Sequence, residues 1–313
     1  MRKRPLGNTG LQVSELALGT WGLSGDGYGP VTEVEQEGVI DRALALGITL
    51  FETADSYAHG AMEKKLGERL PKDGEALVVT KIGTDRSVSP PRKTFKAEFI
   101  RQRVEQSLER LQREAIDVVL LHNPAPRTVE RGEATDALIA LKEAGKIRAW
   151  GVSAGDVETA RAAVQRGTEV LEVAYNAFHA RELKELKAEL LEKNIGVLAR
   201  SVLAHGLLCG MWVSNRDFAS DDHRAARWTH DDLKRRISQL NALRPCVAGG
   251  VTSLRAAALR FVLANEQVSA AVLGPRNAMQ LDQLLRDAGK EPPYLTPEVL
   301  SALDLRLQNV GAA

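Results

Sequence analysis

Short runs of apolar residues alternate with amphipathic segments along almost the whole chain. The apolar runs are rich in β-branched residues and mostly apolar throughout, rather than alternating with polar positions. This pattern is typical of parallel strands that are covered on both faces. It predicts eight strands, over residues 15–20, 48–53, 76–81, 117–122, 147–153, 170–175, 195–200 and 268–273.

The segments between these runs carry helix signals. Thr32 and Glu35 have the spacing of a capping box at the start of one helix. Another helix is predicted over residues 181–192, from the spacing of its apolar positions. Eight strand–helix alternations with no polar linker between them favour a (β/α)8 TIM barrel, formed as a single domain by residues 1–313.

Two segments fall outside the repeat. The opening residues predict a β-hairpin around the turn at 7–10, and one connection, over 203–229 after the seventh strand, is unusually long. Loops of this length in compact domains are usually functional or disordered. Because this one carries Trp212, Phe218 and Trp228, we expect a lid over a binding site. The alternative is a surface insertion that packs on its own aromatic side chains.

A doubly wound open sheet is the competing architecture. It would place a G-x-G-x-x-G turn after the first strand, with an acidic residue about 20 positions later. The glycine-rich segment over 22–29 does not have that spacing. The barrel is therefore the predicted fold.

Composition and charge narrow the function classes. The chain is 44% hydrophobic and 27% charged with a net charge of +1, which is typical of a soluble globular protein. No long block of like charge occurs, so nothing in the sequence argues for nucleic-acid binding. No run approaches the roughly 20 apolar residues that span a bilayer, and none follows the basic N-terminus as in a signal peptide. Cys209 and Cys246 form no CxxC pair. We expect a cytoplasmic protein.

Titratable side chains collect where the predicted strands end. Glu52 and Tyr57 follow the second strand, Lys81 closes the third and His122 closes the fourth. Each alone has a structural explanation, but in (β/α)8 enzymes the carboxyl ends of the strands meet on one face and carry the active site. Together these residues predict acid–base chemistry there.

The strand-end motifs resemble those of the aldo-keto reductases, in the same order and over nearly the whole chain. They are FETADSY at 51–57, VVTK at 78–81, LLHNP at 120–124, GVS at 151–153, YN at 175–176, LAHGLLCG at 203–210 and LGPRN at 273–277. The resemblance implies reduction of a small-molecule carbonyl or sugar by a nicotinamide cofactor.

The resemblance also implies a role for each catalytic candidate. Tyr57 would protonate the carbonyl oxygen as general acid, and the cation of Lys81 would help it to ionise. Glu52 would hold Lys81 in place. His122 would orient the substrate oxygen by a hydrogen bond.

Further positions are implied for the cofactor and the substrate. The implied cofactor contacts are Gly19, Thr20, Trp21, Ser153, Glu172, Arg200, Ser201, Leu203, Gly274, Arg276 and Gln280. Trp21, Tyr28 and Asn123 would wall the substrate pocket. Arg276 lies at a predicted helix start, where a phosphate is favoured, so NADPH is the preferred cofactor and NADH remains possible. Gln280, where a second Arg is common, weakens that preference.

The chain departs from the family pattern at four positions. Glu52 replaces an aspartate, Ala154 an asparagine, Glu172 a glutamine and Arg200 an aromatic residue. A shift of about 1 Å in a catalytic group can cost on the order of 100-fold in rate, so the longer Glu52 predicts either an adjusted pocket or an altered activity. Arg200 can still stack on a planar ring, and its charge favours the reduced over the oxidised nicotinamide.

Two other functions compete with reduction. The departures at Glu52, Ala154 and Glu172 suggest a non-catalytic nicotinamide-binding subunit that senses redox state, of the kind known in this family. Lys81 at a strand end, beside Tyr57 and Glu52, also suits a lyase or aldolase that forms a Schiff base. The histidines have no metal-ligand spacing, and we expect no metal.

Overall fold

A computed structural model describes residues 1–311. Eight parallel strands form a closed barrel in which each strand pairs with the next along the chain and the last pairs with the first. They are β3 (Leu16–Gly19), β4 (Leu50–Glu52), β5 (Leu77–Ile82), β8 (Ile116–His122), β9 (Ile147–Ser153), β10 (Val170–Ala174), β11 (Gly196–Arg200) and β12 (Val268–Leu273). These strands agree closely with the predicted ranges and confirm the (β/α)8 barrel.

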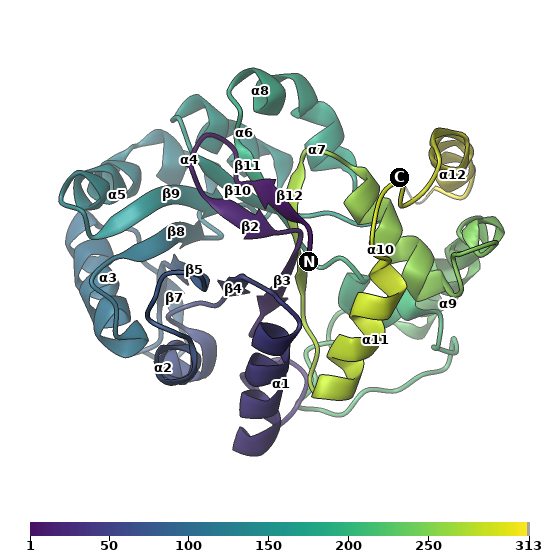
Figure 1. The fold of residues 1–313 in the computed structure, drawn as a ribbon, viewed down its shortest axis with the longest axis horizontal. Coiled ribbons are helices and arrows are strands. Elements are labelled where there is room, and N and C mark those ends of the chain that lie inside the picture. The colour runs from purple at the N-terminus through teal and green to yellow at the C-terminus, as the bar shows by residue number, and fades with distance from the viewer. Residues whose placement is uncertain (312–313) are drawn as a thin grey trace.

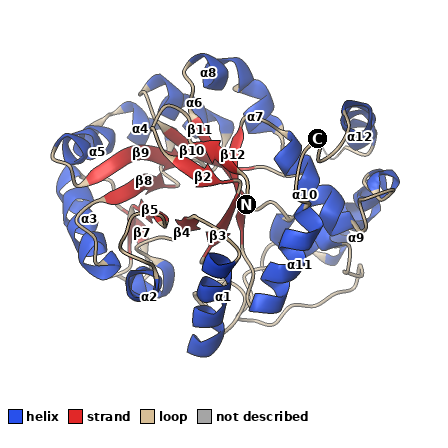
Figure 2. Cartoon of the chain, in the orientation of Figure 1, coloured by secondary structure: helices blue, strands red, loops and turns tan. Residues whose placement is uncertain are grey.

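Helices surround the barrel on its outside (Figure 2). They are α1 (Glu33–Ala45), α2 (Ala61–Arg69), α3 (Ala97–Leu111), α4 (Pro126–Glu130), α5 (Glu133–Glu143), α6 (Val157–Gln165), α7 (Arg181–Glu185), α8 (Lys187–Glu192), α9 (His230–Gln239), α10 (Leu254–Ala264), α11 (Ala278–Ala288) and α12 (Pro297–Asn309). The Thr32–Glu35 capping box is present at α1. Within residues 1–311, no helix has the length and apolar character needed to cross a membrane.

The prediction of one helix over 181–192 was wrong. Two helices, α7 and α8, meet at Leu186, whose backbone leaves the helical region at φ −97° and ψ 3°. The Leu186 side chain is fully buried in the core. The break therefore coincides with a packing contact of Leu186, and no glycine or proline marks it in the sequence.

The predicted N-terminal hairpin closes one end of the barrel. It consists of β1 (Lys3–Pro5) and β2 (Gln12–Ser14), drawn in purple across the strands in Figure 1. Gly7, in the left-handed region at φ 56°, approaches so closely that a Cβ there would lie 2.2 Å from the Gly196 nitrogen. Because Gly196 begins β11, the hairpin covers the amino ends of the strands. The carboxyl ends are left for a site.

The long connection over 203–229 combines both structures considered for it. It begins with a 3-10 turn (Ala204–Cys209), and its rings of Trp212 and Trp228 lie 5.5 Å apart in an edge contact. It also reaches the loop after β3, since the His223 N–H donates to the Gly27 carbonyl at 2.9 Å. The segment therefore packs on its own aromatics and borders the carboxyl-end loops.

A short hairpin and further 3-10 turns complete the described elements. The hairpin, β6 (Thr84–Asp85) and β7 (Arg92–Lys93), follows β5. One 3-10 turn, Tyr57–Gly60, follows β4, and two others, Leu240–Ala242 and Arg244–Cys246, lie between α9 and α10. The turn at Tyr57–Gly60 leads directly into α2, so the packing of α2 helps to place Tyr57.

Gly67 sets how closely α2 approaches α3. A Cβ at Gly67 would lie 2.2 Å from the Arg110 carbonyl oxygen, so Gly67→Ala must push the helices apart. We expect a loss of about 2 kcal/mol in the free energy of unfolding, measured by urea denaturation. The matched control is Gly38→Ala in α1, where a Cβ meets nothing within 4 Å and helix propensity predicts a gain of up to about 1 kcal/mol. Equal effects of the two variants would contradict this.

Candidate active site

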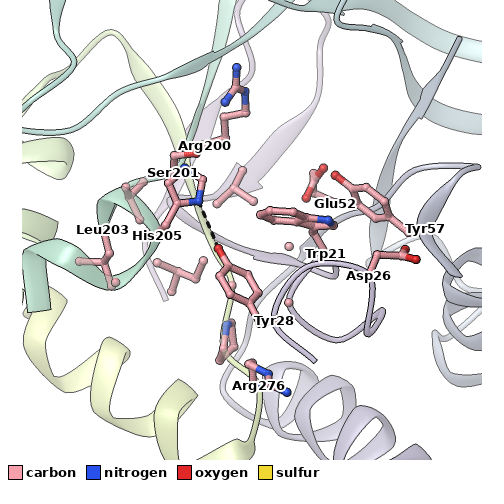
Figure 3. Close-up of a pocket in the computed structure, with 18 of the residues that line it drawn as sticks. Trp21, Asp26, Tyr28, Glu52, Tyr57, Arg200, Ser201, Leu203, His205 and Arg276 are labelled. Atoms are coloured by element: carbon pink, nitrogen blue, oxygen red, sulfur yellow. Dashed lines mark hydrogen bonds between the residues drawn. The ribbon is translucent and has the colours of Figure 1, made fainter. Parts of the chain in front are cut away.

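A cavity of about 800 Å³ opens at the carboxyl ends of the strands (Figure 3). It is the place where the predicted site residues meet. Those that line it are Gly19, Trp21, Tyr28, Glu52, Tyr57, Lys81, His122, Asn123, Ser153, Glu172, Arg200, Ser201, Leu203, Gly274, Arg276 and Gln280. The parallel strands explain the convergence, because their carboxyl ends share one face of the barrel.

Thr20 is the exception among the predicted cofactor contacts. Its side chain is fully buried and is not among the residues that line the cavity. The Thr20 hydroxyl instead donates to the Thr53 hydroxyl at 2.9 Å. Thr20 therefore ties the loop after β3 to the loop after β4, and its neighbours Gly19 and Trp21 face the cavity in its place.

Lys81 is the central cation of the site. Only 2% of its surface is exposed. Its ammonium contacts the Glu52 carboxylate, donates to the Thr53 carbonyl at 3.0 Å and lies 3.9 Å from Glu172 Oε1. Burial lowers the pKa of Lys81 to about 8, and Glu172 opposes that change. The longer Glu52 side chain therefore still reaches the lysine.

Glu172 places a second carboxylate beside the same lysine. Register pairs it with Ser153 on the neighbouring strand, and its Oε2 accepts a hydrogen bond from the Ser153 hydroxyl at 2.5 Å. Glu172 is fully buried, and its Oε1 has no hydrogen-bond partner. From the sequence, Glu172 was predicted only as a cofactor contact; its position opposite Lys81 depends on strand register.

Tyr57 and Lys81 lie close together. The Lys81 ammonium is 5.0 Å from the centre of the Tyr57 ring. Burial raises the pKa of Tyr57 well above its usual range; Glu172 raises it further and Arg200 opposes them. The Tyr57 phenol is therefore protonated at neutral pH and can act as a proton donor.

His122 lies beside Tyr57 in the lining of the cavity. The two rings are 6.1 Å apart in an edge contact. Burial and the nearby cations Lys81, Lys93 and Arg200 hold the pKa of His122 well below its usual range. Its buried Nδ1 has no hydrogen-bond partner. His122 is thus a neutral imidazole with one ring nitrogen unpaired.

The loop after β3 and the long connection over 203–229 together form an aromatic wall. Trp21 and Tyr28 contact each other at 5.1 Å between ring centres, and the Tyr28 hydroxyl shares a hydrogen bond of 3.2 Å with His205 Nδ1, dashed in Figure 3. Burial raises the pKa of Tyr28 to about 12 and lowers that of His205 to about 3. The wall is therefore uncharged at these two groups. His205 was not predicted as a site residue.

Arg276 lies at the opposite end of the cavity, just before α11. Its guanidinium donates to the carbonyls of Gly29 and Pro30 at 3.1 and 2.8 Å, while its Nε is buried without a partner. Its backbone N–H donates to the Gln280 side chain at 2.9 Å. This combination of a guanidinium and a helix N-terminus favours an anion.

Arg200 is anchored beside the strand-end residues. Its guanidinium donates to the Ala154 carbonyl at 2.9 Å. Its charge opposes that of Glu172 at both Tyr57 and Lys81.

Among residues 1–311, no group of three or more His, Cys, Asp or Glu side chains is arranged to hold a metal ion.

The model of the aldo/keto reductase family matches residues 15–304. The chain belongs to this family. It is 30% identical to an aldo-keto reductase of Bacillus subtilis, YhdN, over 92% of this chain and 89% of that protein. It is 29% identical to L-galactose dehydrogenase of Arabidopsis thaliana, over 90% and 86% of the two chains.

Solved structures of the family have the same fold. Glycerol dehydrogenase from Gluconobacter oxydans superposes with a TM-score of 0.84 at 27% identity, covering 99% of this chain and 96% of that one. The holo form of an aldo-keto reductase from Bacillus halodurans gives 0.81 at 24% identity, covering 98% and 96%. As an aldo/keto reductase, the protein is a nicotinamide-dependent oxidoreductase that acts on carbonyls or alcohols.

Removal of the Lys81 charge tests the buried network. Lys81→Met would leave two buried carboxylates without their cation, and we expect the free energy of unfolding at pH 7 to fall by about 3–5 kcal/mol. Lys64→Met is the control, because this lysine is mostly exposed and its ion pair with Glu68, at 3.8 Å, is also exposed to solvent. A change below about 1 kcal/mol in Lys81→Met, by chemical denaturation, would refute a charged network.

Proposed function

We propose that the protein reduces an aldehyde, ketone or sugar carbonyl to the alcohol with NADPH, or catalyses the reverse oxidation. The observation that carries this proposal is the meeting of Tyr57, Lys81, Glu52 and His122 at one end of the cavity. The names of two relatives, L-galactose dehydrogenase and glycerol dehydrogenase, favour a hydroxylated substrate.

The cavity fits a nicotinamide dinucleotide in size and chemistry. Its volume of about 800 Å³ is within the range of small-molecule sites. Glu172 Oε1, which has no hydrogen-bond partner, is an acceptor for an amide N–H, and Ser153 is beside it. Ser153, Glu172 and Arg200 would hold the nicotinamide end of the cofactor. Gly274, Arg276 and Gln280 would hold its adenosine end. When bound, the nicotinamide supplies the hydride that the carbonyl carbon receives.

Side chains of the protein then transfer the proton and stabilise the charge that remains. The protonated Tyr57 phenol donates its proton to the carbonyl oxygen, and neutral His122 orients that oxygen through a hydrogen bond. The Lys81 ammonium beside the Tyr57 ring stabilises the phenolate that remains. Glu52 holds Lys81 in position. Trp21, together with the wall of the long loop, keeps water away from the reacting atoms.

The Schiff-base alternative has less support. An imine-forming lysine needs a free, neutral amine, whereas the Lys81 ammonium is engaged by Glu52 and by the Thr53 carbonyl. The relatives named as a reductase and as dehydrogenases also favour the oxidoreductase over the non-catalytic subunit. The departures at Glu172 and Arg200 are then adjustments of charge within a working site.

Replacement of Tyr57 tests the proton donor. We expect Tyr57→Phe to lower kcat for carbonyl reduction at least 100-fold, the size of a general-acid contribution, while the Kd for NADPH changes less than about threefold. Tyr175→Phe is the control, because Tyr175 is buried against Phe261 and outside the residues that line the cavity. Full turnover by Tyr57→Phe would mean that the proton comes from another group.

The preference for NADPH depends on Arg276. Titration with NADPH and NADH, followed by quenching of tryptophan fluorescence, should give tighter binding of NADPH. We expect Arg276→Ala to raise the Kd for NADPH about tenfold, roughly 1.4 kcal/mol, and that for NADH much less, because only NADPH carries the additional phosphate. The exposed Arg286 at the far end of α11 provides the control, Arg286→Ala. Equal losses for both cofactors would refute the phosphate contact.

A further inference from the structure

An ion pair holds the backbone on both sides of Tyr57. Arg86 donates to the carbonyl oxygen of Ser56 at 2.6 Å, immediately before Tyr57. The N–H of Ala58, immediately after it, donates to the Asp26 carboxylate at 2.7 Å. Arg86 and Asp26 also bind each other, at 3.2 Å. The two side chains thus form a bracket around one residue.

The bracket joins three separate loops at the cavity. Asp26 lies in the loop after β3, between Trp21 and Tyr28; Arg86 follows β6; and Tyr57 lies after β4. Asp26 and Arg86 both line the cavity. Figure 3 shows Asp26 on the same side of the pocket as Tyr57 and Glu52. No sequence motif indicated either residue.

The backbone after Tyr57 requires such support. Ala58 and His59 have φ values of 47° and 54°, in the left-handed region that residues with a Cβ avoid. Two consecutive non-glycine residues in this conformation persist only where surrounding contacts hold them. The Asp26 carboxylate supplies one such contact, through the Ala58 N–H. The Arg86 contact fixes the Ser56 carbonyl at the other side of the turn.

We propose that Asp26 and Arg86 act as a positioning pair that aims the Tyr57 hydroxyl into the cavity. This inference rests on the proposed function only in taking Tyr57 as the proton donor. The pair differs from an ordinary surface ion pair because each partner is bonded to the backbone beside the catalytic residue. Its side chains are 22% and 26% exposed, so solvent screens it only in part.

The pair also connects the aromatic wall to Tyr57, the proposed general acid. Asp26 shares its loop with Trp21 and Tyr28, and that loop is bonded to the long connection through Gly27 and His223. A displacement of the wall therefore reaches the Ala58 N–H through a single carboxylate. Since about 1 Å of misplacement can cost on the order of 100-fold in rate, loss of the pair should act on kcat.

Kinetics of single and double variants give the first test. We expect Asp26→Ala and Arg86→Ala each to lower kcat 10- to 100-fold, with KM for the carbonyl and Kd for NADPH within about threefold. The double variant should lose no more than the worse single variant, because the two residues act as a unit. Arg86→Lys, which keeps a cationic donor, should recover part of kcat. The control is Arg161→Ala, which removes the 2.7 Å pair with Glu189 on the outer helices.

Amide hydrogen exchange gives a second test that needs no turnover. In Asp26→Ala the Ala58 amide should exchange at least tenfold faster, while the Asp55 amide, bonded to the Lys81 carbonyl at 3.0 Å, should be unchanged. Unchanged exchange at Ala58 would overturn the inference, and so would a raised KM with normal kcat, which would indicate that the pair binds substrate. An active Tyr57→Phe enzyme with fast Ala58 exchange in Asp26→Ala would refute the proposed proton donor instead, and with it the catalytic purpose of the pair.

Discussion

The site depends on a lysine that is buried between two carboxylates. Lys81 on β5, Glu52 at the end of β4 and Glu172 on β10 are all inaccessible to solvent or nearly so. An isolated charge in such a place would be costly, and only partners of opposite sign make it tolerable. Closure of the barrel brings these three strands together. The fold therefore places the two carboxylates beside Lys81, and the carboxylates stabilise its buried charge.

This arrangement holds more negative charge than one lysine can balance. Glu172 carries an acceptor oxygen without a hydrogen-bond partner. Arg200, on the strand next to Glu172, contributes a guanidinium that is bonded to a carbonyl rather than to a carboxylate. The two residues act in opposite directions on Tyr57 and on Lys81. The departures from the family pattern at positions 172 and 200 therefore offset each other electrostatically, which a position-by-position comparison does not reveal.

Most of the fold and much of the cavity followed from the sequence because both depend on periodic patterns. Apolar runs indicated the eight strands, and the strand ends indicated Tyr57, Lys81 and His122. The sequence was less informative where a residue's role depends on local backbone conformation. The resemblance implied a cofactor contact for Thr20, whose side chain lies outside the residues that line the cavity, and the break at Leu186 has no glycine or proline to mark it. Asp26 and Arg86 were missed because their contacts depend on loop conformations that no spacing encodes.

The division of the site between strands and loops explains why the loop residues matter. Lys81, Glu52 and Glu172 are fixed by strand register, and their side chains are held by the packed wall of the barrel. Tyr57 instead lies on a turn whose next two residues are in an unfavourable backbone conformation. The barrel fixes the chain before this turn, since the Asp55 amide donates to the Lys81 carbonyl at 3.0 Å, and α2 follows the turn directly. Between these two anchors, the bonds of Asp26 and Arg86 to the backbone on either side of Tyr57 supply the contacts that hold the turn itself.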